Sequence, residues 1–177
     1  LDAVDAADRA VAAAASAFES WSQTPVGDRI QHLFRYKTIL EAHADELAAI
    51  LVREHGKTMG ESVGSVRRGI DCIEHACAAP VLMMGRTLPQ IAVSSSFCRT
   101  EDEGGIGIDS SADRMPLGVC VGITPFNFPI MVPMWMWPMA VACGNTFVLK
   151  PSEKDPISAI RTTELAQEAG FPDGVLN

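Results

Sequence analysis

The sequence predicts an α/β fold, in which N-terminal helices precede the first strands and helices of a doubly wound parallel sheet. Before residue 86, apolar residues recur at helical spacing, and after residue 116 short β-rich runs alternate with helical ones. With 177 residues and 47% hydrophobic content, the chain is long enough for one ordinary core. The last four residues, "GVLN", would begin a further strand, so the predicted sheet is incomplete.

Residues 1–85 are predicted to be helical. An Ala-rich run comes first, and the helix after it is expected to have Thr24 as its N-cap and Pro25 as its first helical residue. The apolar periodicity breaks near His43, which favours two consecutive helices, and Gly56 follows as a stop signal.

A further helix is predicted after Gly56, over "KTMGESVGSVRRGIDCIEHACAAP", and is expected to end at Pro80. Residues 86–116 then accumulate Ser, Gly and Asp and lose helical periodicity. They are predicted to form a loop, or a hairpin with a loose turn around Gly104 and Gly105.

Residues 117–177 contain the alternation that defines the fold class. "GVCVGIT" and "NTFVLKP" are predicted strands, "MVPMWMWPMAVACG" a helix between them, and "PISAIRTTELAQEAG" a helix after the second. Between residues 117 and 144 the chain is uncharged and long enough to cross a bilayer. Four prolines would interrupt such a span and no basic cluster flanks it, so a helix buried on several faces, with Met and Trp as core residues, is preferred.

Charge and cysteine content exclude some classes of function. A net charge of −8 argues against nucleic acid or anionic lipid as the main partner. Five cysteines form an odd number without a C-x-x-C pair, which favours a reducing compartment. The first residues show no secretory signal, and we expect a cytoplasmic protein, or a mitochondrial-matrix protein if the source is eukaryotic.

The polar residues that follow the two strands are the best site candidates. Asn127 comes just after the first strand, where open α/β sheets bind ligands, and its amide could donate to a developing oxyanion. An Asn that only stabilises a turn is an equally ordinary reading. Lys150 and Glu153 follow the second strand and could hold the hydroxyls of a ribose. The alternative is a solvated loop with a helix N-cap at Ser152 or Asp155.

Two long segments resemble the aldehyde dehydrogenase superfamily. They are "PLGVCVGITPFNFPIMVPMWMWPMAVACGNTFVLKPSEKDP" and, upstream, "HGKTMGESVGSVRRGIDCIEHACAAPVLMMG". The chain is most similar to the CoA-acylating branch that acts on malonate semialdehyde and its methyl derivative. The resemblance implies a Rossmann-like domain that binds NAD without a G-x-G-x-x-G motif, with CoA as co-substrate, and a homo-oligomeric enzyme.

Carried over position by position, the resemblance also implies roles for individual residues. Asn127 would supply the side-chain half of the oxyanion hole for the thiohemiacetal and thioester steps. Thr124 and Phe126 would line the nicotinamide side of the cofactor channel. Lys150 and Glu153 would bind the adenosine ribose.

Two further residues complete this set of implied site residues. Lys154 would lie close to the ribose. Arg68, in "GSVRRGI", matches a position associated with the acidic semialdehyde or its CoA thioester. An exposed helix arginine with no such role is the ordinary alternative, because surface arginines are common.

The chain departs from the family pattern in two respects. Ser94–Arg114 is longer than the family's connection in this region, which forms part of an oligomerisation hairpin, so that contact is in doubt. The family also requires a nucleophilic Cys, and none of the five cysteines matches it. We therefore expect packing cysteines, a catalytic Cys outside this chain, and no turnover by the 177 residues alone. The alternative is a non-catalytic protein of the same fold that binds nucleotide or other subunits.

Four histidines, all in predicted helices, show no metal-ligand spacing: His32, His43, His55 and His75.

Overall fold

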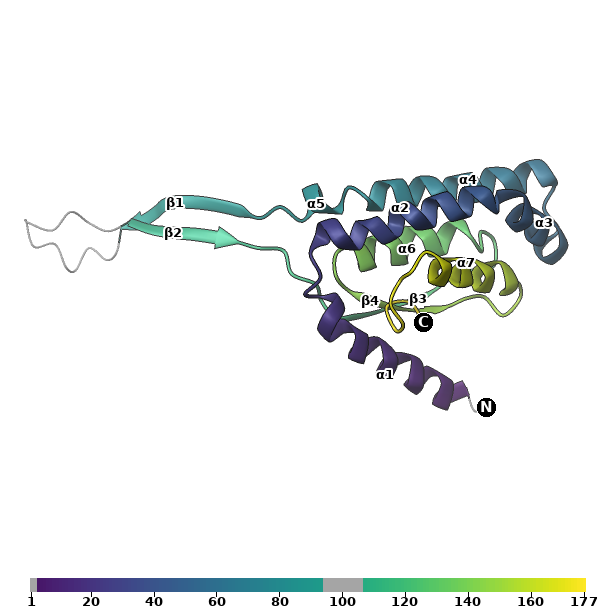
Figure 1. Ribbon diagram of the computed structural model, residues 1–177, viewed down its shortest axis with the longest axis horizontal. Coiled ribbons are helices and arrows are strands. Elements are labelled where there is room, and N and C mark those ends of the chain that lie inside the picture. The colour runs from purple at the N-terminus through teal and green to yellow at the C-terminus, as the bar shows by residue number, and fades with distance from the viewer. Residues whose placement is uncertain (1–2, 94–106) are drawn as a thin grey trace, which may run out of the picture.

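The computed structural model describes residues 3–93 and 107–177. Helices make up the first part of this described chain, a long hairpin follows, and strands and helices then alternate (Figure 1). The elements are α1 (Ala3–Trp21), α2 (Val26–Ala42), α3 (Ala44–His55), α4 (Met59–Ala76), α5 (Ala79–Leu82), β1 (Arg86–Val93), β2 (Gly107–Ala112), β3 (Val119–Ile123), α6 (Met131–Ala142), β4 (Thr146–Lys150) and α7 (Ile157–Glu168). The predicted α/β class, with N-terminal helices before a parallel sheet, is confirmed.

The helix boundaries follow local signals with two exceptions. His43 separates α2 from α3, as predicted, and Gly56 ends α3 in the left-handed conformation with φ of 83°. The predicted cap of α2 is wrong by one residue: Pro25 is the N-cap, and the Thr24 hydroxyl donates to the Ser20 carbonyl oxygen at 3.2 Å instead. The predicted end at Pro80 is also wrong, because α4 ends earlier and Pro80 lies in the first turn of α5, where a missing N–H costs nothing.

Helix α4 begins with a capping box that sequence reasoning missed. The Glu61 N–H donates to Thr58 Oγ1 at 3.3 Å, and the Thr58 N–H donates to Glu61 Oε2 at 3.1 Å. One of the helix's glycines is needed for packing: a Cβ at Gly69 would lie 3.3 Å from side-chain atoms of Ile130 and Met134. Helices α4 and α6 therefore approach each other closely.

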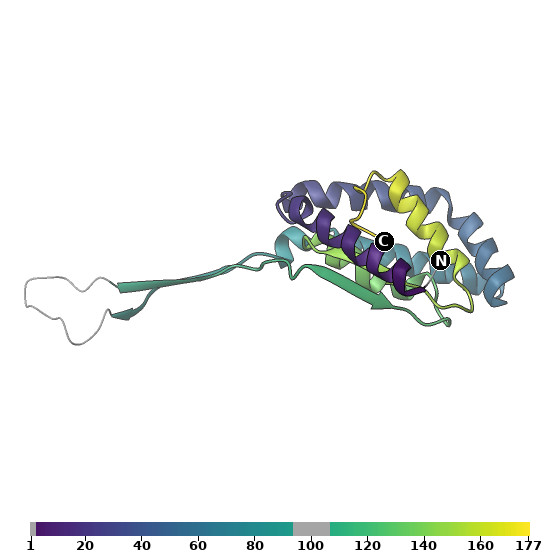
Figure 2. The same cartoon turned by 90° about the horizontal axis from the view of Figure 1, so that it is seen from below.

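The parallel sheet lies between α6 and α1. Strands β3 and β4 pair in parallel, and Leu176 adds a parallel bridge to Phe147, where a third strand was predicted. Phe147 faces α6, since a Cβ at Gly122 would lie within 3.0 Å of both Phe147 and Met136. On the opposite face, the Thr146 hydroxyl donates to the Ala14 carbonyl oxygen of α1 at 2.9 Å. Figures 1 and 2 show the resulting layers of helix, sheet and helix.

Helix α6 is buried on several sides, as predicted. Met134 and Trp137 are almost completely buried in the core, where Trp137 packs against Tyr36 with ring centroids 5.1 Å apart. The prediction that the Trp residues of this helix are core residues is wrong for Trp135, which is 57% exposed. Among the described helices, none has the length and hydropathy to cross a bilayer.

The hairpin β1–β2 projects from the compact body (Figures 1 and 2). Its strands are antiparallel, with Arg86 opposite Ala112 and a shift in register between Leu88 and Ala92. This decides between the predicted loop and hairpin in favour of the hairpin. The predicted turn at Gly104 and Gly105, and most of the Ser94–Arg114 segment, lie outside the described residues.

Candidate active site

Parallel pairing brings the ends of β3 and β4 together at one edge of the sheet. Ile123 is the register partner of Lys150, and the Thr124 N–H extends the pairing by donating to the Lys150 carbonyl oxygen at 3.1 Å. The residues after each strand must therefore lie side by side, in the crevice where open α/β sheets bind ligands. We call residues 124–129 the Asn127 turn and residues 150–155 the Lys150 loop.

The Asn127 turn is fixed by contacts at several points. Thr124 is buried, and Pro125 and Pro129 restrict the backbone on either side of the asparagine. The Val132 N–H donates to the Phe128 carbonyl oxygen at 3.1 Å, which joins the turn to the start of α6. Asn127 itself is exposed, so its amide can reach a bound molecule.

Lys57 also holds the Asn127 turn, and sequence reasoning did not single it out. Its Nζ donates to the Asn127 carbonyl oxygen at 2.7 Å and lies 4.1 Å from the centroid of the Phe128 ring. Burial lowers the pKa of Lys57 and nearby Arg68 lowers it further, whereas Glu61 opposes the shift. The only sequence signal for this contact is that Lys57 sits at a fixed corner between Gly56 and the capping box of α4.

Arg68, in α4, lies near this corner. Its Nη2 would be 4.0 Å from a Cβ at Gly64, one turn earlier, so the side chain folds back towards the start of α4. Arg68 is exposed, and its positive charge is close enough to lower the pKa of Lys57. The structure thus places Arg68 near Lys57, the residue that contacts the Asn127 turn.

The Lys150 loop carries an exposed ion pair. Lys150 Nζ and Glu153 Oε2 are 3.0 Å apart, and the two side chains are 55% and 78% exposed. The pKa of Glu153 is lowered, first by the backbone N–H that its carboxylate accepts from and then by Lys150. Lys154 joins the two strand ends, because its Nζ lies 4.3 Å from the centroid of the Phe126 ring.

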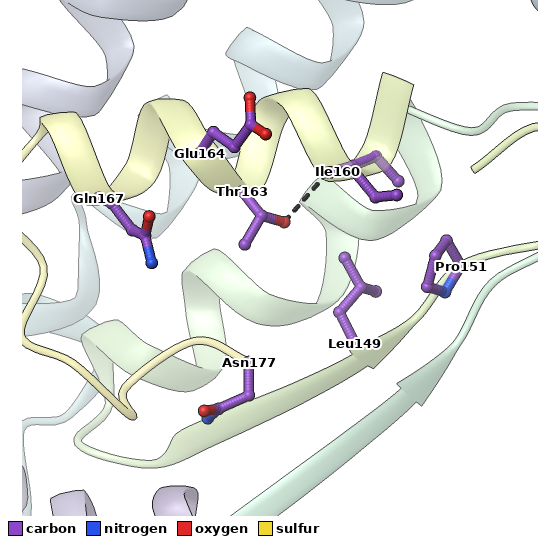
Figure 3. A pocket seen from close by; sticks show the side chains of 8 residues that line it. Leu149, Pro151, Ile160, Thr163, Glu164, Gln167 and Asn177 are labelled. Atoms are coloured by element: carbon purple, nitrogen blue, oxygen red, sulfur yellow. Dashed lines mark hydrogen bonds between the residues drawn. The ribbon is translucent and has the colours of Figure 1, made fainter. Parts of the chain in front are cut away.

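A pocket of about 200 Å3 lies between the end of β4 and α7, beside the Lys150 loop (Figure 3). Its wall is mainly apolar, and amide and carboxylate groups stand at its edge. An apolar slot next to an exposed carboxylate and ammonium suits a flat heterocycle attached to a diol. The lining residues are Leu149, Pro151, Ala159, Ile160, Thr163, Glu164, Gln167 and Asn177.

Helix α3 provides the cap of α7. The Ile157 and Ser158 N–H groups donate to the two carboxylate oxygens of Glu54, at 2.7 and 3.1 Å. The alternative helix caps named from the sequence are therefore wrong: Ser152 Oγ accepts from the Lys154 N–H, and Asp155 makes no cap. The local sequence could not show that a residue 103 positions away satisfies these donors.

Asp155 is left buried by this arrangement. Its exposed fraction is 2%, and neither carboxylate oxygen has a hydrogen-bond partner in the described chain, although the Ser152 side chain is near enough to stabilise the charged form. Burial raises the pKa of Asp155, and the charge of Glu54 raises it further. Asp155 therefore supports the loop from within and does not face solvent.

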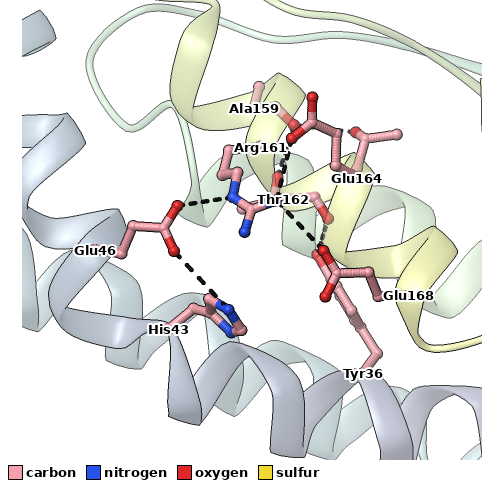
Figure 4. Close-up of polar contacts among 9 residues, drawn as sticks. Tyr36, His43, Glu46, Ala159, Arg161, Thr162, Glu164 and Glu168 are labelled. Atoms are coloured by element: carbon pink, nitrogen blue, oxygen red, sulfur yellow. Dashed lines mark hydrogen bonds and ion pairs between the residues drawn. The ribbon is translucent and has the colours of Figure 1, made fainter.

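Ion pairs hold α7 against α3 on the outer surface (Figure 4). Arg161 Nε lies 2.8 Å from Glu46 Oε1, and Arg161 Nη1 lies 3.2 Å from Glu164 Oε2 and 3.4 Å from Glu168 Oε1. These carboxylates raise the pKa of Arg161, with Glu46 the largest cause. Because α7 forms one wall of the pocket, this network helps to fix the pocket's shape.

The described cysteines are not activated nucleophiles. The pKa of each is raised, and burial is the first cause in every case. Cys98 lies outside the described residues. In the part of the chain that the structure describes, no group of three or more His, Cys, Asp or Glu could hold a metal ion. The described cysteines are Cys72, Cys77, Cys120 and Cys143.

Comparison with known proteins identifies the family of this chain. The sequence profile of the aldehyde dehydrogenase family matches residues 2–177. The chain therefore belongs to the aldehyde dehydrogenase family.

Two curated relatives are named malonate-semialdehyde dehydrogenase. Malonate-semialdehyde dehydrogenase 1 of Geobacillus thermodenitrificans is 55% identical over 170 residues, which cover 96% of this chain and 32% of the relative. Malonate-semialdehyde dehydrogenase of Bacillus cereus is 52% identical over the same shares. The chain thus spans about a third of the length of the curated relatives it matches.

Solved structures give the same result. The methylmalonate-semialdehyde dehydrogenase of Oceanimonas doudoroffii has a TM-score of 0.87 and 46% identity, covering 96% of this chain and 32% of that one. A Sinorhizobium meliloti protein assigned as a methylmalonate-semialdehyde dehydrogenase, solved in complex with NAD, has a TM-score of 0.85 and 40% identity, covering 95% and 32%.

Proposed function

We propose that this chain forms the N-terminal part of an NAD-dependent, CoA-acylating dehydrogenase of malonate semialdehyde or methylmalonate semialdehyde. One observation carries the proposal: the Asn127 turn and the Lys150 loop lie next to each other at the carboxyl edge of the parallel sheet. The names of the relatives supply the substrate class, and the bacterial origin of those relatives favours the cytoplasm over the mitochondrial matrix.

NAD fits the residues of the Lys150 loop. When bound, NAD would accept a hydride from the substrate. Glu153 and Lys150 would hold the two hydroxyls of the adenosine ribose, and the apolar slot beside Pro151 would take the adenine ring. Glu153 would also repel a 2′-phosphate, so the site favours NAD over NADP.

The Asn127 turn would serve the chemical step. The Asn127 amide would donate a hydrogen bond to the oxygen that gains negative charge when the aldehyde is attacked. Thr124 and Phe126 would line the nicotinamide end, and Lys154 over the Phe126 ring would keep that wall in place. Arg68 would attract the carboxylate of the semialdehyde or the CoA thioester.

The nucleophile would come from outside these residues. Attack on the aldehyde requires a thiolate, and burial raises the pKa of each described cysteine, which disfavours the thiolate. We therefore propose that a Cys beyond the 177 residues completes the site, because no acyl-enzyme can form without a thiolate. The second candidate, a non-catalytic subunit that binds nucleotide, is favoured by the same observation, that no cysteine in the described part of the chain is activated.

The experiment is an assay of NAD-dependent oxidation of malonate semialdehyde with CoA, using the complete protein that carries this sequence. The proposal predicts NADH and an acyl-CoA in equal amounts. Binding of NAD without NADH formation would support the non-catalytic alternative. Oxidation by the 177 residues alone would contradict the assignment of the nucleophile to another part of the protein.

A further inference from the structure

We infer that Lys57 is a positioning residue for the oxyanion donor, acting through the backbone of the Asn127 turn. The inference rests on the proposed function of Asn127 and adds a residue to it. A helix corner 70 positions away reaches the carbonyl of the very residue whose side chain is assigned to the reaction.

Two contacts of Lys57 fix the turn in different ways. The 2.7 Å hydrogen bond to the Asn127 carbonyl oxygen sets the orientation of the peptide plane between Asn127 and Phe128. The ammonium over the Phe128 ring, 4.1 Å from its centroid, holds the next side chain. Together they determine the direction in which the Asn127 side chain leaves the backbone.

Lys57 is itself well anchored. Gly56 adopts the left-handed conformation just before it, and the capping box of Thr58 and Glu61 begins just after it. Lys57 is half-buried, and its short hydrogen bond to the Asn127 carbonyl oxygen lies at the surface. Because this corner is fixed, the Lys57 ammonium can hold the Asn127 turn in one orientation.

The charges around Lys57 agree with a bond to a neutral carbonyl. The charges of Glu61, Arg68 and Asp155 all affect the pKa of Lys57. Lys57 nevertheless forms no ion pair within 4.0 Å among the described residues. Its polar partner is the Asn127 oxygen. The hydrogen bond of Lys57 therefore goes to the turn.

The test is a double-mutant cycle in the complete enzyme with Lys57→Gln and Asn127→Ala. Lys57→Gln is expected to lower kcat by about 10- to 100-fold, because a small misplacement of a catalytic group has effects of this size, and to leave KM nearly unchanged. In the Asn127→Ala background, Lys57→Gln should have almost no further effect on kcat. Additive effects, or a rise in KM alone, would overturn the inference and indicate that Lys57 contacts substrate.

Conservative and matched variants separate positioning from folding. Lys57→Arg keeps a cationic donor that can also lie over an aromatic ring, and its kcat is expected to stay within about threefold of the wild type. Lys37→Gln is the control: Lys37 pairs at 3.2 Å with Glu41 and with Glu74, which lies near the end of α4 opposite to Lys57, and its loss should leave kcat unchanged. A Lys57→Arg variant as slow as Lys57→Gln would count against the inference.

A readout without turnover keeps the result independent of the proposed function. Hydrogen exchange should speed up in a peptide covering residues 124–132 of Lys57→Gln and stay unchanged in one covering β4. If Lys57→Gln fails to fold, Phe128→Leu replaces it in the cycle, with the same non-additivity expected. Full activity of Asn127→Ala would refute the proposed role of Asn127, whereas normal kcat in Lys57→Gln with an impaired Asn127→Ala would refute only the positioning.

Discussion

The two strand ends of the site are held in different ways. The Asn127 turn is fixed from outside, by Lys57 from the α3–α4 corner and by the first turn of α6. The Lys150 loop presents an exposed ion pair that is held mainly by its own residues. The first arrangement suits a group that must be in place before a charge develops, and the second suits one that adjusts to a bound cofactor.

The largest expected effect comes from removing the fixed group. Asn127→Ala in the complete enzyme should lower kcat by about 10²- to 10³-fold, because one oxyanion donor contributes a factor of this size. The dissociation constant for NAD, measured by fluorescence titration, should stay within about twofold of the wild type. An unchanged kcat would remove the distinction between the two strand ends.

Disturbing the shared sheet should affect both strand ends together. A Cβ at Gly122 would lie 2.6 Å from Phe147 Cζ, so Gly122→Ala should lower the free energy of unfolding by about 1–3 kcal/mol. Chemical denaturation measures this change. Gly60→Ala is the control, since a Cβ there meets nothing within 4 Å, and it should leave stability unchanged or raise it by up to about 1 kcal/mol.

A change in the exposed ion pair should affect the cofactor and leave the chemistry intact. Glu153→Gln should weaken NAD binding by about tenfold and reduce the preference for NAD over NADP, because the carboxylate that accepts from the ribose and repels a 2′-phosphate is lost. At saturating NAD, kcat should be unaffected. Glu19→Gln, on the exposed side of α1, is the control. Tighter NAD binding by Glu153→Gln would show that the ribose lies elsewhere.

The smallest effect concerns the buried carboxyl under the Lys150 loop. Burial raises the pKa of Asp155 in the folded protein above its ordinary value of 3.8. At a pH between these two pKa values, Asp155 is therefore protonated in a larger fraction of folded chains than of unfolded chains. This carboxyl therefore lowers stability as pH rises through that window. Asp155→Asn should raise the free energy of unfolding at pH 7 by about 1 kcal/mol, and the gain should vanish below the ordinary pKa.

Denaturant melts at several pH values test this prediction. Asp8→Asn, at an exposed position of α1, should show a much smaller gain. A loss of stability at pH 7 in Asp155→Asn would mean that Lys57 and His55, which favour the charged form, outweigh the burial.

Local signals predicted most of the fold. The break at His43, the stop at Gly56 and the alternation after residue 116 each depend on residues close together in the sequence, and each is confirmed. The errors at Thr24 and Pro80 are local too, since a proline fits either the cap or the first turn of a helix. The capping box of Thr58 and Glu61 was visible in the sequence but went unrecognised.

The site was harder to predict. Strand ends and polar residues pointed to Asn127, Lys150 and Glu153, but their roles came from the family resemblance and remain proposals. Lys57 and Glu54 could not be found, because their partners lie 70 and 103 positions away and only the folded chain brings them together. Long-range contacts of single side chains leave no periodicity that a sequence can show.

The most direct test of the account is a crystal structure of the complete protein with NAD bound. We predict the adenosine ribose within hydrogen-bond distance of Glu153 and Lys150, the adenine in the slot beside α7, and the nicotinamide towards the Asn127 turn. NAD bound away from both strand ends would contradict the central claim, which is that the two ends form one dehydrogenase site with a fixed half and an adaptable half.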